Sequence, residues 1–132
     1  MILDTNGLSA IADGDLTLEP LLHRAAEIAV PVIVLGEFRY GIKQSRNRAQ
    51  YEGWLAETIP LYRVLVVDEA TAEKYAEVRD ELKRIGRPIP ANDLWIAALV
   101  RQHMLPLRQH MLPLLSRDQH FDFVPRLKRV TW

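Results

Sequence analysis

Short apolar runs recur along the chain and predict the strands of a buried sheet. The first run covers residues 1–3 and stops abruptly at Asp4, and a β-branched run covers residues 30–34. Continuous apolar runs of this length are typical of strands that are buried on both faces. We therefore predict strands at 1–3, 30–34, 61–67 and 112–116, and an edge strand at 128–132.

Apolar positions spaced three and four residues apart predict helices between these strands. Asp68 is a candidate N-cap, and Gly86 followed by two prolines is a typical helix stop. A break between two helices is predicted near Ser45. The predicted helices cover 16–29, 35–44, 46–59 and 69–85, and a further one begins near residues 92–93.

Strands that alternate with helices predict an α/β fold with a mostly parallel central sheet and helices on both faces. Connections between parallel strands are expected to be right-handed. A chain of 132 residues, of which 48% are hydrophobic, suits one domain spanning residues 1–132.

Composition narrows the functional classes. The chain has no cysteine, which excludes cysteine-based zinc sites and removes any need for an oxidising compartment. It shows no signal-peptide pattern and no apolar run of the roughly 18–20 residues that cross a bilayer, so we expect a cytoplasmic protein without a membrane partner. A net charge of zero argues against a protein that coats nucleic acid, but not against an enzyme that meets it through a local patch.

Four carboxylates follow the carboxyl ends of predicted strands, where sites form in parallel α/β sheets. They are Asp4, Glu37, Asp93 and Asp118. Taken singly, each of them has a structural explanation: a turn at Asp4, a solvated helix position at Glu37, a helix cap at Asp93 and a turn at Asp118. Together they would repel one another unless a cation neutralised them. Mg²⁺ or Mn²⁺ suits such oxygen ligands, and can acidify water and stabilise charge on a phosphate. The pattern therefore predicts phosphodiester hydrolysis.

These carboxylates lie in segments that resemble the PIN-domain ribonucleases, specifically the VapC-type toxins of toxin–antitoxin pairs. The resemblance covers the whole chain in order and rests on MILDTN (1–6), VLGEFRYG (34–41), NDLWIAA (92–98) and LLSRDQHFD (114–122). It implies a three-layer PIN-like fold and an Mg²⁺- or Mn²⁺-dependent endoribonuclease that cleaves tRNA or other structured RNA with metal-activated water. By position, the catalytic and metal-binding quartet would be Asp4, Glu37, Asp93 and Asp118, and the supporting polar positions would be Asn6, Ser116 and Asp122.

The resemblance also implies partners: an RNA substrate, a VapB-type antitoxin whose C-terminal segment blocks the acidic site from an apolar groove, and a homodimer or hetero-oligomer. The residues that could line such a groove, or could instead be ordinary core, are Phe38, Tyr40, Ile42, Tyr51, Trp54 and Leu55. Basic residues that could contact RNA phosphates, or simply form a solvated helix face, are Arg39, Lys43, Arg46 and Arg48. We interpret His120, which lies near the acidic site, as a turn residue.

Two other functions fit parts of the pattern. A catalytically silent module with the same fold could act only within an antitoxin–DNA complex, which the neutral charge and the apolar groove allow. A small-molecule phosphatase is disfavoured, because the chain lacks the Asp-x-Asp start of an aspartyl-phosphate mechanism.

The heptad RQHMLPL occurs twice in succession, at 101–107 and 108–114. The first copy continues the helix that begins near Asp93, and the second leads into the strand before Asp118. Pro106 lacks an N–H group and clashes inside a helix, at a cost of roughly 3 kcal/mol. We predict that the helix ends near 103–105, that a surface excursion continues to about residue 111, and that the duplication is absorbed rather than functional.

Deletion of residues 101–107 tests this interpretation. The shortened chain keeps one complete heptad, so it should fold with an unchanged or higher melting temperature and keep its RNA-cleaving activity. Circular dichroism melting and an RNA-cleavage assay measure the two properties. Loss of cleavage in a folded deletion variant would show that the repeat has a function.

Overall fold

A computed structural model describes residues 1–104 and 112–132. Its sheet has five strands in the order β3-β2-β1-β4-β5, and every neighbouring pair is parallel. This confirms the predicted α/β fold and places the last strand at the sheet edge, as expected. The strands are shorter than the apolar runs suggested: β1 (Ile2–Leu3), β2 (Ala29–Pro31), β3 (Arg63–Leu65), β4 (Leu114–Leu115) and β5 (Arg129–Val130).

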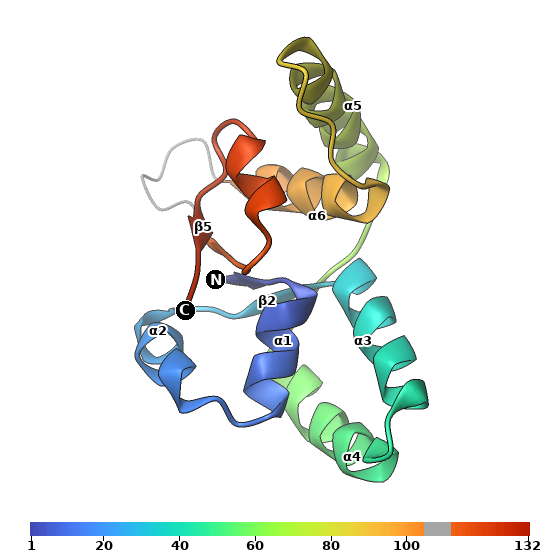
Figure 1. Ribbon diagram of the computed structural model, residues 1–132, viewed down its shortest axis with the longest axis vertical. Helices are drawn as coiled ribbons and strands as arrows, with labels where there is room; N and C mark the ends of the chain where they lie inside the picture. Colours follow the sequence, from blue (N-terminus) through green and yellow to red (C-terminus); the bar gives the residue numbers. More distant parts are fainter. Residues whose placement is uncertain (105–111) are drawn as a thin grey trace.

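Helices cover both sides of the sheet and make three layers (Figure 1). One side carries α1 (Thr5–Ala12), α2 (Glu19–Arg24), α3 (Val32–Gln44) and α4 (Arg48–Thr58). The other carries α5 (Glu69–Arg84), α6 (Ala91–Gln102) and the 3₁₀ helix η3 (Gln119–Phe123). Two further 3₁₀ turns are η1 (Leu16–Leu18) and η2 (Ile59–Leu61). Among the helices of the described residues, none is long and apolar enough to cross a membrane.

The core lies around β1 and β4, two adjacent inner strands of the sheet. Ile2, Leu3, Leu114 and Leu115 have no exposed surface. Gly7 lets α1 lie directly on β4, because a Cβ atom at this position would come within 3.1 Å of the Leu115 carbonyl oxygen. Close packing at this point fixes the start of α1, and therefore the position of Asp4 just before it.

Several predicted helix boundaries are confirmed. The break at Ser45 separates α3 from α4. Helix α5 begins after Asp68, whose side chain accepts a hydrogen bond from the Thr71 backbone N–H while the Thr71 hydroxyl accepts one from the Asp68 N–H. This reciprocal capping box satisfies two backbone donors that would otherwise lack partners.

The single helix predicted over 16–29 is wrong. The structure has the short turn η1, then α2, which ends at Arg24. The end of the predicted helix belongs to the sheet, because the Ala29 N–H donates to the Met1 carbonyl over 2.8 Å and the Met1 amino group donates to the Glu27 carbonyl over 2.7 Å. Pairing with β1 thus overrides the local helical spacing.

The strand predicted over 30–34 is wrong in its second half. Strand β2 ends at Pro31 and α3 begins at Val32, with Pro31 as its N-cap residue. The apolar run concealed a helical pattern, since α3 buries Val34, Leu35, Phe38 and Ile42 on one face. The early start of α3 places Glu37 in the second turn of the helix, where the predicted helix over 35–44 had it in the first.

The duplicated heptad joins two anchored elements. Helix α6 ends at Gln102 with His103 as its C-cap, which is close to the predicted end, and the second copy leads into β4 as predicted. Arg101 is buried: its Nη1 lies 2.8 Å from Glu81 Oε2, and its Nη2 donates to the Pro125 carbonyl over 2.6 Å. The first residue of the heptad is therefore structural. The excursion predicted up to residue 111 lies outside the described residues.

Candidate functional site

The four predicted carboxylates line one cavity of about 610 Å³. Asp4 lies between β1 and α1, and Glu37 lies in the second turn of α3. Asp93 is in the first turn of α6, and Asp118 is the N-cap of η3 just after β4. The structure thus brings together residues that are up to 114 positions apart in the chain, at the carboxyl ends of the adjacent strands β1 and β4.

Asp4 is the most enclosed of the four, with 5% of its surface exposed. Its Oδ2 accepts a hydrogen bond from Ser116 Oγ over 2.6 Å, and its Oδ1 accepts one from the Thr5 N–H over 2.7 Å. Burial raises the pKa of Asp4 above its ordinary value, the two hydrogen bonds counteract this rise, and the nearby charges of Glu37 and Asp118 add to it. The carboxylate is therefore held in place without a cation.

Glu37 is held in the same way. The Thr5 hydroxyl donates to Glu37 Oε2, and Asn92 Nδ2 donates to Glu37 Oε1 over 2.8 Å. These bonds tie α3 to α1 and to the first turn of α6. Thr5 and Asn92 stand next to predicted site residues in the sequence, but spacing alone did not reveal that both hold Glu37.

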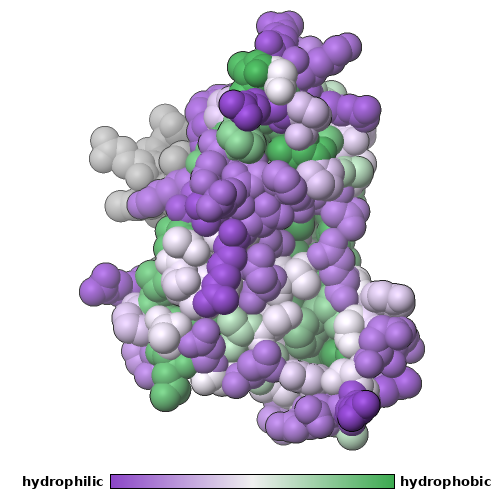
Figure 2. All heavy atoms as spheres, in the orientation of Figure 1, coloured by the Kyte–Doolittle hydropathy of each residue, from purple (hydrophilic) through white to green (hydrophobic). Residues whose placement is uncertain are grey.

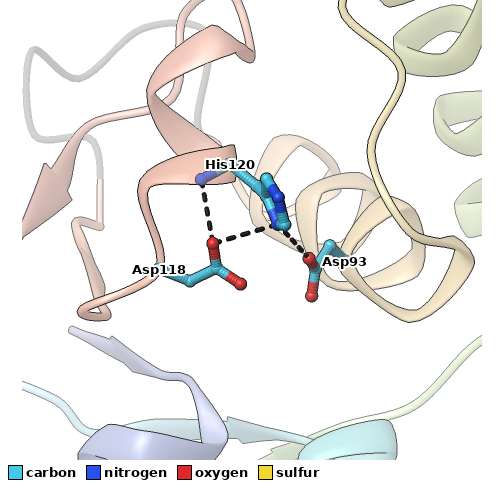
Figure 3. Close-up of side chains that lie close together, drawn as sticks. All are labelled: Asp93, Asp118 and His120. Carbon is cyan, nitrogen blue, oxygen red and sulfur yellow. Dashed lines mark hydrogen bonds and ion pairs between the residues drawn. The ribbon is translucent and has the colours of Figure 1, made fainter.

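Asp93 and Asp118 face each other across the ring of His120 (Figure 3). His120 Nδ1 lies 3.3 Å from Asp93 Oδ2 and 3.1 Å from Asp118 Oδ1. One ligand atom from each of the three residues lies within 4.8 Å of the others. Burial, followed by the charge of Asp118, raises the pKa of Asp93 to about 6.

The interpretation of His120 as a turn residue is incomplete. Its backbone N–H does form a turn, because it donates to Asp118 Oδ1 over 2.9 Å. Its ring also joins the two carboxylates. The only signal in the sequence is the Asp-x-His spacing, which does not say that η3 directs the ring toward α6.

Of the three supporting residues, Ser116 and Asn6 contact the quartet directly. Besides its bond to Asp4, Ser116 Oγ accepts from the Asp118 N–H over 2.9 Å, and Asn6 Nδ2 lies 3.5 Å from Asp4 Oδ2. Asp122 does not line the cavity. It pairs with Arg129 through two hydrogen bonds of 2.7 and 2.8 Å, and Arg129 in turn donates to the Ser116 carbonyl over 3.0 Å. Asp122 therefore supports the site indirectly, through Arg129 and Ser116.

A second cleft, of about 290 Å³, runs along α3 and shares four lining residues with the acidic cavity: Thr5, Ser9, Asp13 and Glu37. Its apolar lining includes Phe38, Ile42 and Tyr51, as predicted for a groove. The other three candidates do not line it: Leu55 is core, Trp54 is half-buried against Phe38, and Tyr40 is 67% exposed. The two clefts are therefore adjacent, and Glu37 belongs to the wall that they share.

The basic residues that could contact RNA, or could instead form a solvated helix face, do not line either cleft. Arg39, Lys43, Arg46 and Arg48 are exposed, and Arg48 pairs with Glu52. Figure 2 shows hydrophilic side chains gathered in the middle of the face, over the region where η3 and α1 approach one another. Arg117 and Trp132 also line the acidic cavity, although no pattern in the sequence singles out either residue.

The donor set fits a hard divalent cation. Within residues 1–104 and 112–132, no Lys or Arg forms an ion pair with Asp4, Glu37, Asp93 or Asp118. Carboxylate oxygens are the ligands that Mg²⁺ and Mn²⁺ prefer, and an imidazole nitrogen is acceptable to Mn²⁺ more than to Mg²⁺. Uncompensated carboxylates with raised pKa values are the expected state of such a site without its cation.

Comparisons with known proteins agree on one family. The PIN domain family matches residues 1–127. The chain is 33% identical to Ribonuclease VapC5 from Mycobacterium tuberculosis over 109 residues, which cover 80% of this chain and 78% of the relative. Its fold is similar to that of VapBC2 from Rickettsia felis bound to a promoter DNA fragment, with a TM-score of 0.80, 25% identity, and coverage of 99% of this chain and 97% of that chain. FitAcB from Neisseria gonorrhoeae is similar, with a TM-score of 0.80, 26% identity, and coverage of 98% and 96%.

The raised pKa of Asp93 predicts a stability change. Between the ordinary value of 3.8 and about pH 6, the folded chain keeps a proton on Asp93 that the unfolded chain has released. Stability in EDTA should therefore fall as pH rises through this interval, and the loss should persist at neutral pH. Asp93→Asn removes the charge, so it should raise the melting temperature at pH 7.5 by a few degrees and abolish most of the stabilisation that Mn²⁺ gives the unmutated chain.

Asp80→Asn is the matched control, because Asp80 is an exposed carboxylate on α5 whose one ion pair among the described residues is with Arg84. It should leave both the pH profile and the response to Mn²⁺ unchanged. If Asp93→Asn lowered the melting temperature in EDTA at pH 7.5, ionised Asp93 would not carry the cost of burial and of repulsion by Asp118 that its raised pKa implies.

Proposed function

The chain belongs to the PIN domain family and, within it, to the VapC-type proteins, and we propose that it is a toxin that hydrolyses RNA phosphodiester bonds with the help of Mg²⁺ or Mn²⁺. Its substrate is tRNA or another structured RNA, which places its action in the cytoplasm. One observation carries the proposal: four carboxylates from four separate segments line one cavity, and no Lys or Arg among the described residues pairs with them.

Asp4, Glu37, Asp93 and Asp118 would hold the cation. When bound, it supplies positive charge to the phosphate and lowers the pKa of a water molecule. The remaining residues position these ligands. Ser116 joins the carboxylate of Asp4 to the backbone at Asp118, and Thr5 joins α1 to Glu37.

Protonation of the site limits the pH at which it can work. With a pKa of about 6, Asp93 is largely ionised at pH 7.5 and available as a ligand. Protonated Asp93 would bind a cation poorly, so activity should decline toward pH 6 and below. His120 contacts both Asp93 and Asp118, so it holds their carboxylates in one relative arrangement.

The second cleft suits an inhibitory protein segment. Solved structures similar to this chain include VapBC and FitAcB complexes, some of which are bound to DNA. We propose that a VapB-type antitoxin places an extended segment along α3, over Phe38, Ile42 and Tyr51, and reaches Glu37 at the shared end of the two clefts. The resulting hetero-oligomer, with or without a toxin homodimer at its centre, would then close the acidic cavity.

DNA binding within a complex is a second possible function, because the similar Rickettsia felis VapBC2 structure is bound to a promoter DNA fragment. The chain could act only as a silent member of a DNA-binding complex. The two functions differ in the role of the carboxylates, which a silent module does not need.

Asp4→Asn should reduce RNA cleavage by more than about 100-fold, because it removes one ligand charge from a buried position. Ser116→Ala should reduce it by roughly tenfold, because Asp4 and Asp118 lose a shared support. The assay uses purified chain and labelled tRNA, with Mg²⁺ or Mn²⁺ and with EDTA. Glu19→Gln, an exposed change in α2, serves as the control.

Equal cleavage by the unmutated chain with Mn²⁺ and with EDTA would contradict the metal-dependent mechanism. Growth arrest on expression of the unmutated chain but not of Asp4→Asn would exclude the silent module. Growth arrest by neither, together with promoter binding in a complex, would favour it.

Gly41→Trp should separate inhibition from catalysis. Gly41 lines the α3 cleft, and a Cβ atom there meets nothing within 4 Å, so an indole would fill the cleft without disturbing the core. The variant should cleave RNA normally but resist inhibition by a coexpressed VapB-type antitoxin. Gly53→Trp on α4 is the matched control, because its Cβ also meets open space but Gly53 does not line the cleft. Inhibition of Gly41→Trp to the same extent as Gly53→Trp would place the antitoxin elsewhere.

A further inference from the structure

The acidic cavity carries more negative charge than one divalent cation at the quartet would neutralise. Six carboxylates line it, from Asp4, Asp13, Asp15, Glu37, Asp93 and Asp118. An RNA strand that enters is itself an anion, and such strands are bound through positive charges on the protein. Among the lining residues that the structure describes, Arg117 is the one cation.

Arg117 is built into the edge of the site. It stands between Ser116 and Asp118, and its backbone N–H donates to Asn6 Oδ1 over 3.1 Å. Asn6 also contacts Asp4, so the backbone of Arg117 is tied to the quartet from both sides. These bonds hold the backbone of Arg117 at the edge of the cavity.

The guanidinium group of Arg117 stacks on an aromatic ring, and this contact leaves its N–H donors available. Its Cζ lies 4.3 Å from the centroid of the Trp132 ring, which covers one side of the group. The Trp132 indole N–H donates to Asp15 Oδ2 over 3.2 Å, so the ring is itself fixed. Arg117 Nη2 approaches the same Asp15 oxygen only to 4.0 Å, and 57% of the Arg117 side chain is exposed. Most of its N–H donors therefore face solvent beside the cavity.

We propose that Arg117 binds a backbone phosphate of the RNA strand, adjacent to the bond that is cleaved, and that Trp132 positions it for this contact. The inference rests on the proposed ribonuclease function and names a substrate contact within it. A planar guanidinium presents paired N–H groups that match two phosphate oxygens, and stacking on an aromatic ring restricts its orientation before the RNA arrives. A phosphate contact of this kind confers affinity without base preference.

The test measures RNA binding without cleavage. Chain carrying Asp4→Asn is titrated in Mg²⁺ with a fluorescent single-stranded RNA oligonucleotide, and anisotropy gives the binding constant at several salt concentrations. Adding Arg117→Ala should weaken binding about tenfold. It should also reduce the slope of log K against log salt by about 0.7, the contribution of one phosphate contact on a single strand. Arg117→Lys keeps the charge and should retain the slope.

Trp132 and a second arginine provide the matched controls. Trp132→Ala should weaken binding with little change in slope, because it frees the Arg117 side chain without removing its charge, whereas Trp132→Phe should resemble the parent. Arg87→Ala removes another arginine stacked on an aromatic ring, 4.8 Å from the centroid of Phe123, that does not line the cavity. It should leave the slope and the affinity unchanged.

The outcomes separate this inference from the function on which it rests. Unchanged slope and affinity in Arg117→Ala, while the parent binds RNA, would overturn the role of Arg117 and leave the ribonuclease proposal intact. Absence of RNA binding by the parent, together with absence of cleavage by the unmutated chain, would overturn both. In cleavage assays without Asp4→Asn, Arg117→Ala should raise KM more than it lowers kcat.

Discussion

Mutual repulsion between four carboxylates is the constraint on which the local structure of this protein depends. Asp4, Glu37, Asp93 and Asp118 line one cavity, and within the described part of the chain they are held by neutral donors and one histidine. A lysine or arginine in the cluster would relieve the repulsion and would also occupy the place of a cation. Hydroxyl and amide donors fix the oxygens and leave their charge uncompensated, and burial, followed by the charges of neighbouring carboxylates, raises the pKa values of Asp4 and Asp93.

The parallel sheet makes this arrangement stable. Strands β1 and β4 are neighbours and fully buried, so the residues that follow them, Asp4 and Ser116, meet at one edge. Helix α3 then presents Glu37 from its second turn, and α6 presents Asp93 from its first. The duplicated heptad does not disturb this geometry, because Arg101 is anchored to Glu81 and Pro125 on one side and Leu114 pairs with Ile2 on the other.

Much of the fold and the core of the site could be predicted from the sequence, because apolar runs and strand-end carboxylates are local signals. Asp4 and Asp118 directly follow their strands or a short turn, so their convergence needed only the parallel topology. The failures arose where distant pairing decided the outcome. Residues 27–29 leave a helical pattern to pair with β1, and the apolar run at 30–34 divides into a strand and a helix because Pro31 ends the strand. The roles of His120, Thr5 and Arg117 depend on side-chain directions across elements, which spacing does not encode.

The central claim is that the four carboxylates form the site of a divalent cation. Crystals of the protein soaked in Mn²⁺ and measured at a wavelength with strong manganese anomalous scattering test it most directly. An anomalous peak is expected inside the acidic cavity, within ligand distance of oxygens from at least two of Asp4, Glu37, Asp93 and Asp118, and it should be lost in Asp4→Asn crystals. A fully soaked crystal with no peak in this cavity, or with manganese bound only elsewhere, would contradict it.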